Sequence, residues 1–116
     1  NRRIFLTLML SNNRNIKKLN KQFRNKNKAT DILSFPFNKK FKLKNNLYLG
    51  DIIISYNFMN KPKNQKIYLF KDKLIKSFIH GFLHLLGFDH KNIKEYKKML
   101  KEEDTIYQSV IKKALN

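Results

Sequence analysis

The three histidines of this chain constrain its fold more than any other feature. All of them fall within one segment, His80-Gly-Phe-Leu-His84-Leu-Leu-Gly-Phe-Asp-His90. If the segment starts as an α-helix, His80 and His84 differ by about 40° in azimuth and project from one face of that helix. Gly87 can then end the helix in a left-handed conformation, and the reversed chain can bring His90 back to the same point. The spacing therefore predicts a helix, a turn and a returning segment built around one cluster of imidazoles.

Three imidazoles around one point are typical of a metal site. With three side-chain ligands, the coordination sphere keeps an open position for water or substrate, as in catalytic rather than structural zinc sites. The alternative is that these are separate helix-surface and turn histidines, but the complete set at this spacing favours a metal. Neutral imidazoles favour zinc, although nickel, copper or iron can occupy such a site, and the absence of cysteine excludes thiolate ligands. We therefore predict one Zn²⁺ ion bound by His80, His84 and His90.

The same spacing separates this chain from zinc endopeptidases. Their pattern, H-E-x-x-H-x-x-G-x-x-H, is matched at every named position except the second, where this chain has Gly81. In those enzymes the glutamate is the general base that activates the metal-bound water. Proteolysis is therefore a poor prediction for this chain, although a zinc hydrolase acting on peptides or small phosphoesters stays an open alternative.

Hydrophobic periodicity along the rest of the chain predicts one α+β domain. Strands are predicted at Ile4–Leu10, Asp31–Phe37 and Leu47–Ser55, and helices after Ser11, over Lys73–Leu86 and over Ile93–Lys113. The first two strands, joined by a helix, are expected to pair in parallel, and the third is expected to return antiparallel. The result is a small mixed β-sheet flanked by helices, in which the metal-binding helix is followed by a C-terminal helix.

Polar residues predict where these elements begin and where loops separate them. Side-chain caps are expected at Ser11, at Asp72 and, as a capping box with Glu95, at Asn92. Two stretches are predicted to be loops: 38–46, which is lysine-rich and polar, and 57–67, which lacks clear periodicity and is expected to be exposed.

The net charge points to a polyanionic partner. The chain has 26 Lys and Arg residues against 8 Asp and Glu residues, a formal charge of +18, which attracts RNA, DNA or anionic surfaces. Lysine and asparagine are spread over the whole chain, so a general compositional bias is an equally good explanation. No segment approaches the roughly 20 apolar residues of a membrane-spanning helix, and we expect no membrane partner.

Beyond these physical arguments, the histidine segment resembles the signature of the YbeY family, the bacterial endoribonucleases of ribosomal-RNA maturation. Segment 80–90 fits that signature throughout, including the glycine, aromatic residue and aspartate before the last histidine. Further matches are Thr30–Phe37, Leu49–Ser55, Leu19-Asn20, Phe23-Arg24, Met99 and Glu102-Glu103. The resemblance runs from about Ile4 to the C-terminus. It implies a single domain over residues 1–116 that lacks the strand and helix preceding this point in the family.

The resemblance carries expectations about activity. It implies a single-strand-specific, metal-dependent endoribonuclease that acts in the cytoplasm in forming the 3′ end of 16S ribosomal RNA and takes part in ribosome quality control. Its partners would be ribosomal RNA and the small ribosomal subunit. His80, His84 and His90 would bind zinc and Arg24 would face the RNA phosphate, so Arg24 and His80 are the expected catalytic residues. The alternative function is a noncatalytic RNA-binding ribosome-assembly factor with a structural zinc, which predicts RNA affinity without turnover.

Two further interpretations concern polar residues near the expected site. Asp51 and Asp89 are the nearest carboxylates that can orient a ligating histidine, although Asp89 can equally shape the turn before the last histidine. Thr30, Asp31 and Ser34 are expected either to line the cleft or to satisfy hydrogen bonds at strand ends.

Overall fold

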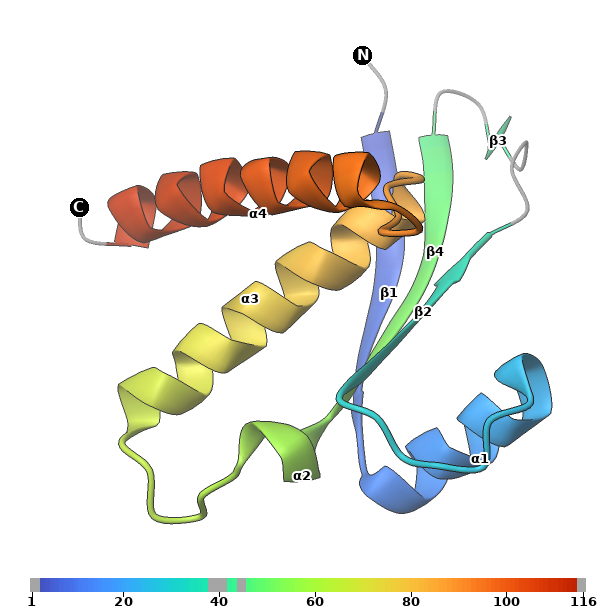
Figure 1. The fold of residues 1–116 in the computed structure, drawn as a ribbon, viewed down its shortest axis with the longest axis vertical. Coiled ribbons are helices and arrows are strands. Elements are labelled where there is room, and N and C mark those ends of the chain that lie inside the picture. Colours follow the sequence, from blue (N-terminus) through green and yellow to red (C-terminus); the bar gives the residue numbers. More distant parts are fainter. Residues whose placement is uncertain (1–2, 38–41, 44–45, 115–116) are drawn as a thin grey trace.

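The structure confirms an α+β fold (Figure 1). It is a computed structural model and describes residues 3–37, 42–43 and 46–114. Along the chain the elements are β1 (Arg3–Ser11), α1 (Asn13–Arg24), β2 (Ile32–Pro36), β3 (Lys42–Leu43), β4 (Asn46–Ser55), α2 (Tyr56–Met59), α3 (Ile67–Leu85) and α4 (Ile93–Ala114). Among these residues, no helix is long and apolar enough to cross a membrane.

The sheet is mixed, with β4 at its centre. β1 pairs with β4 in parallel, from Arg3 opposite Asn46 to Ser11 opposite Ser55, while β2 and the short β3 pair with β4 antiparallel. The strand order is β1-β4-β2, so the expected parallel pairing of the first two strands is wrong. The antiparallel return of the third predicted strand onto the second is confirmed. β4 takes the central position because its run of isoleucines is buried on both faces of the sheet.

Successive isoleucines of β4 form two separate cores. Ile52 and Ile54 cluster with Leu85 of α3, whereas Ile53 clusters with Ile16 of α1. This alternation follows from the two-residue period of a strand, which points neighbouring side chains to opposite faces. As a result, α3 covers one face of the sheet and α1 packs against the other (Figure 1).

The C-terminal helix packs on α3 rather than on the sheet. A third cluster joins Ile79 and Leu83 of α3 to Met99 of α4, whose side chain is 1% exposed. Further along, the Tyr107 hydroxyl of α4 donates a hydrogen bond to Asp72 of α3. These contacts hold one face of α4 against the helix that carries two of the histidines (Figure 1).

The helix α3 is longer than predicted. It begins at Ile67 rather than Lys73, and its first residue follows Lys66, whose side chain makes no capping hydrogen bond. The predicted cap, Asp72, lies inside the helix and forms an ion pair with Lys76 at 3.1 Å. The prediction of an Asp72 cap is wrong because this carboxylate finds its partners on α3 and α4 instead of at a helix start.

The other two predicted caps differ in outcome. Asn12 caps α1, accepting a hydrogen bond from the Asn15 N–H at 2.8 Å, so the predicted cap at Ser11 is wrong by one residue. At α4, the Asn92 side chain accepts from the Glu95 N–H at 2.9 Å, as predicted. The Glu95 carboxylate accepts from the backbone N–H just before Asn92, at 3.2 Å. The start of α4 is therefore set by the predicted pair of side chains.

The predicted loops contain more regular secondary structure than expected. The stretch 57–67 begins within α2 and ends at the first residue of α3. The Ser55 side chain caps α2 by accepting a hydrogen bond from the Phe58 N–H at 3.3 Å. Most of the stretch 38–46 lies outside the described residues, and within it residues 42–43 form β3.

Candidate metal centre

The end of α3 and the turn after it carry the three histidines. His80 and His84 lie four residues apart on the last part of the helix. The helix ends in a Schellman motif, in which the Gly87 N–H donates to the carbonyl of His84 and the Phe88 N–H to that of Leu83, both at 3.0 Å. Gly87 has the left-handed φ of 101° that this motif favours. The predicted glycine stop is confirmed, and it turns the chain so that the last histidine returns toward the helix.

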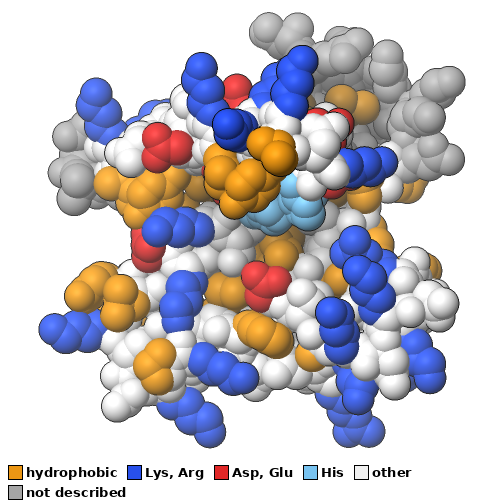
Figure 2. Space-filling view, viewed as in Figure 1, with side chains coloured by type: hydrophobic (Ala, Val, Ile, Leu, Met, Phe, Trp, Pro, Cys, Tyr) orange, Lys and Arg blue, Asp and Glu red, His pale blue; other side chains and the backbone are white. Residues whose placement is uncertain are grey.

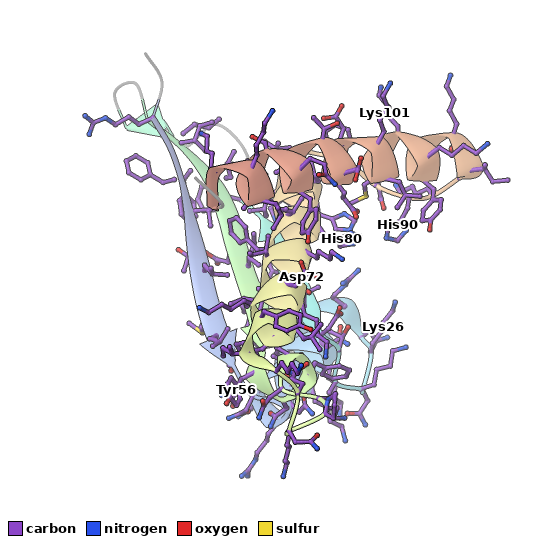
Figure 3. All side chains as sticks on the ribbon, turned by 90° about the vertical axis from the view of Figure 1, so that its left-hand side faces the viewer. Lys26, Tyr56, Asp72, His80, His90 and Lys101 are labelled. Atoms are coloured by element: carbon purple, nitrogen blue, oxygen red, sulfur yellow. The ribbon has the colours of Figure 1, made fainter. Side chains whose placement is uncertain are left out.

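The three imidazoles meet beyond this turn. Figure 3 labels two of them, His80 and His90. The Nε2 atoms of His80 and His84 are 3.0 Å apart, and one ligand nitrogen from each of the three rings lies within 4.8 Å of the others. The ring centroid of His90 is 5.9 Å from that of His80 and 5.3 Å from that of His84. Nitrogens bound to a tetrahedral zinc ion at about 2.0–2.1 Å lie about 3.4 Å apart, within this range of separations. The group can therefore hold a metal ion.

Hydrogen bonds hold the outer nitrogens of two of these rings. Nδ1 of His84 lies 3.0 Å from the carbonyl oxygen of Phe88, and Nδ1 of His80 lies 2.7 Å from Oε1 of Glu103 on α4. Both acceptors place the proton of the neutral ring on Nδ1, which directs the Nε2 lone pair toward the centre. Two lone pairs facing each other at 3.0 Å repel unless a cation lies between them. The hydrogen bonds thus fit a donor set that coordinates through Nε2.

The histidines open onto a cleft of about 490 Å³. Arg24 lines this cleft from the end of α1, and Thr30, Asp31 and Ser34 line it from the segment that leads into and through β2. In Figure 2 the histidine surface is visible in the hollow below α4. Of the two roles expected for Thr30, Asp31 and Ser34, the structure shows the first, since they line the cleft, while Thr30 and Ser34 also make hydrogen bonds there. The fold brings Arg24 to the same cleft as the three imidazoles.

Known proteins of one family match nearly the whole chain. The family model described as Endoribonuclease YbeY matches residues 1–111. The chain belongs to the YbeY family. Endoribonuclease YbeY of Pelagibacter ubique strain HTCC1062 is 67% identical over 109 residues, which are 94% of this chain and 71% of that protein. Endoribonuclease YbeY of Aliarcobacter butzleri strain RM4018 is 42% identical over 101 residues, 87% of this chain and 70% of the relative.

A solved structure shows the same fold. The solution structure of a Thermotoga maritima protein superposes with a TM-score of 0.56 at 27% sequence identity, covering 92% of this chain and 68% of the other. The family resemblance stated from the motifs is confirmed, and membership in the YbeY family supports an endoribonuclease role.

Gly81 of this YbeY-family site occupies the position of the peptidase glutamate and packs against the sheet. A Cβ atom at Gly81 would lie 2.8 Å from Cδ1 of Ile32 and 2.9 Å from Oγ of Ser34. The Ser34 hydroxyl donates a hydrogen bond to the Gly81 carbonyl at 3.2 Å. A glutamate here would have to displace the side chains of Ile32 and Ser34, because packed interiors have little room for added atoms. This contact supports the argument from sequence against proteolysis.

Neither of the two carboxylates expected to orient a histidine of this YbeY-family site forms a hydrogen bond with an imidazole ring. Asp51 accepts a hydrogen bond from the Tyr48 hydroxyl, so its expected role is wrong. Asp89 accepts from the backbone N–H of His90 at 2.7 Å, which lowers the pKa of its carboxyl and shapes the turn, the second role expected for it. The carboxylate that does bond to a histidine ring is Glu103. Sequence analysis missed this role, although the residue belongs to one of the segments that resembled the family.

The fold disfavours protonation of His84 in this YbeY-family site. Burial lowers the pKa of its imidazole below the ordinary value of 6.5, and the charge of neighbouring His80 lowers it further, while the hydrogen bond to Phe88 opposes both. His84 is therefore neutral at pH 7 and can coordinate a metal without first losing a proton.

We expect the metal-free protein to lose stability on acidification. Because the pKa of His84 is lower in the folded than in the unfolded chain, the unfolded state takes up this proton near pH 6.5 while the folded state resists it. The contribution is complete above about pH 6.5 and is lost as the pH falls below that value. Urea unfolding with a chelator at about pH 7.5 and about pH 5.5 should show a smaller loss in His84→Gln than in the wild type. An equal pH dependence in both proteins would contradict this assignment.

Proposed function

We propose that this chain is a single-strand-specific, zinc-dependent endoribonuclease in which His80, His84 and His90 hold one zinc ion. The observation that carries the proposal is the convergence of three imidazole nitrogens within 4.8 Å of one another in a cleft that Arg24 also lines. Membership in the YbeY family supports the reaction class. Three neutral nitrogen ligands suit zinc and leave room in its coordination sphere for a substrate.

Phosphodiester cleavage assigns separate roles to the residues of the cleft. The transition state concentrates negative charge on the nonbridging phosphate oxygens. Zinc, when bound, supplies a Lewis acid at this point and lowers the pKa of water to about 7. Arg24 stays protonated and presents a planar fork of donors that engages two phosphate oxygens at once. His80 keeps its Nε2 directed at the reacting centre because Nδ1 is already occupied.

The shape and charge of the molecule favour a single RNA strand as substrate. A cleft of about 490 Å³ accommodates a flexible segment whose backbone and bases can turn inward, which a base-paired helix does not permit. The formal charge of +18 draws the polyanion to the surface. Following the family resemblance, the proposed substrate is ribosomal RNA of the small subunit in the cytoplasm. The proposed roles are maturation of the 16S 3′ end and ribosome quality control.

Arg24→Ala tests the role of the cleft in RNA cleavage. A charged hydrogen bond contributes about 1.5–3 kcal/mol, so we expect initial rates on single-stranded ribosomal RNA to fall about 10–100-fold. Arg14→Ala removes the same charge from an exposed position on α1 and should change the rate less than about twofold. Arg24→Lys should recover part of the loss. Wild-type rates in Arg24→Ala would remove this residue from the proposal, and no cleavage by the zinc-loaded wild type would reject endoribonuclease activity.

The high positive charge also favours a second candidate, a noncatalytic RNA-binding ribosome-assembly factor with a structural zinc. Such a protein binds RNA with an affinity that falls steeply with salt concentration, but it does not cleave the strand. Binding and cleavage measured on one zinc-loaded sample, after rigorous removal of contaminating nucleases, separate the two functions.

A further inference from the structure

Helix α4 delivers one carboxylate to the metal centre. Met99, Glu103 and Tyr107 recur every four residues on α4, so their side chains lie on one face of the helix. Met99 is buried against α3, and Tyr107 bonds to Asp72 of α3, so both ends of this face are held. Between them, Oε1 of Glu103 lies 2.7 Å from Nδ1 of His80. The packing of the two helices therefore places this carboxylate on the ring.

Both members of this pair are partly withdrawn from water. The side chain of His80 is 33% exposed and that of Glu103 is 27% exposed. A hydrogen bond in such surroundings is stronger than one on the open surface, because fewer water molecules compete for its donor and acceptor. The contact is thus suited to hold one orientation of the ring.

No other side chain has this relation to the cluster in the part of the chain that the structure describes. Nδ1 of His84 is held by the backbone carbonyl of Phe88, which a substitution does not remove. Asp89 bonds to the backbone N–H of His90 and not to its ring. Among residues 3–37, 42–43 and 46–114, Glu103 is therefore the side chain outside the cluster that hydrogen-bonds to one of its imidazole rings.

We propose that Glu103 is a positioning residue for the metal ion. By accepting a hydrogen bond from Nδ1–H of His80, it holds the ring with Nε2 facing the centre, and its negative charge makes the imidazole a stronger donor to a cation. The same bond links metal binding to the docking of α4 on α3, because an ordered His80 ring favours the contact between the two helices. The inference rests on the zinc site of the proposed function and not on RNA cleavage.

Zinc affinity measured by competition with a colorimetric chelator tests this role. Glu103→Gln keeps the size of the side chain but removes its charge, and we expect zinc to bind about 10–100-fold more weakly. The matched control is Glu102→Gln, which removes the same charge one residue away. Glu102 has no hydrogen bond or ion pair in the described structure, and its substitution should change affinity less than about twofold. Equal zinc affinity in Glu103→Gln and the wild type would overturn the inference.

A purely structural tether between the helices predicts a different pattern. Glu103→Gln would then lower the stability of the metal-free protein to urea while leaving the zinc affinity of the folded protein unchanged, which also overturns the inference. If Glu103→Gln does not fold, long-range ¹H–¹⁵N spectra of the zinc-loaded wild type decide. Protonated Nδ1 and ligated Nε2 at His80 support the role, and ligation through Nδ1 overturns it.

Failure of this inference and failure of the proposed function give different results. A wild-type protein that binds no zinc would reject the metal site and the role of Glu103 together. Tight zinc binding without RNA cleavage would reject the nuclease and leave the role of Glu103 to be judged by the affinity of Glu103→Gln.

Discussion

The expected result of His84→Ala is a protein without stoichiometric zinc that cleaves RNA about 10³-fold more slowly. A catalytic metal stabilises the transition state by several kcal/mol, and each 1.4 kcal/mol changes the rate by about a factor of ten. His84 occupies the middle of the cluster, with its Nε2 3.0 Å from that of His80. Two imidazoles remain after the substitution, and they bind zinc much more weakly than three. Elemental analysis of the purified protein and initial cleavage rates measure the two effects.

The control for His84→Ala is Leu86→Ala. Leu86 lies two residues further along the same helix end, and its side chain is 45% exposed. Leu86 does not belong to the histidine cluster, so the zinc content and the cleavage rate of Leu86→Ala should stay close to those of the wild type. One equivalent of zinc retained by His84→Ala would show that His84 is not a ligand, and undiminished cleavage would place the chemistry elsewhere.

Gly50→Ala is expected to destabilise the fold by more than about 3 kcal/mol, because it combines backbone strain with overpacking. Gly50 has a φ of 140° in β4, where it pairs with Pro36 of β2. A Cβ atom here would lie 2.3 Å from the carbonyl oxygen of Phe35 and 2.8 Å from the backbone nitrogen of Phe37. Because both neighbours are backbone atoms, the clash is relieved only if β2 moves away from β4. Urea unfolding of the metal-free protein measures the loss.

Gly87→Ala separates the two contributions in Gly50→Ala. Gly87 also has a left-handed φ, of 101°, but no atom lies within 4 Å of the place where a Cβ would stand. Only the backbone strain applies at Gly87, and we expect Gly87→Ala to lower the free energy of unfolding by about 1–2 kcal/mol. If Gly50→Ala costs no more than Gly87→Ala, the close approach of β2 to β4 at Gly50 is not present in solution.

The metal cluster was predictable because its main parts are local. The four-residue spacing of His80 and His84 places both on one helix face, and the conformational freedom of Gly87 ends that helix. The same holds for the start of α4, where Asn92 bonds to the N–H of Glu95 at 2.9 Å. Each of these features depends on the backbone geometry of fewer than about a dozen residues, which the order of side chains specifies directly.

The position of Arg24 and the role of Glu103 required different kinds of information. The family resemblance indicated Arg24, and the structure brings it to the histidine cleft through the packing of α1 on the sheet. The contact between Glu103 and His80 joins residues 23 positions apart, and no periodicity within α4 marks one of its acidic residues as the partner of a histidine. Only the crossing of α4 over α3, set by buried Met99, selects Glu103.

The sequence by itself therefore determined most of the elements, the glycine stop and the grouping of the three histidines, all of which follow from short-range periodicity and capping. The tertiary structure alone decided that β4 lies between β1 and β2, that α3 begins at Ile67, and that a carboxylate of α4 meets a histidine of α3. The physical reason is that strand order and helix crossing depend on which apolar surfaces cover one another. That choice compares the whole set of packed arrangements, and no single segment of the chain encodes it.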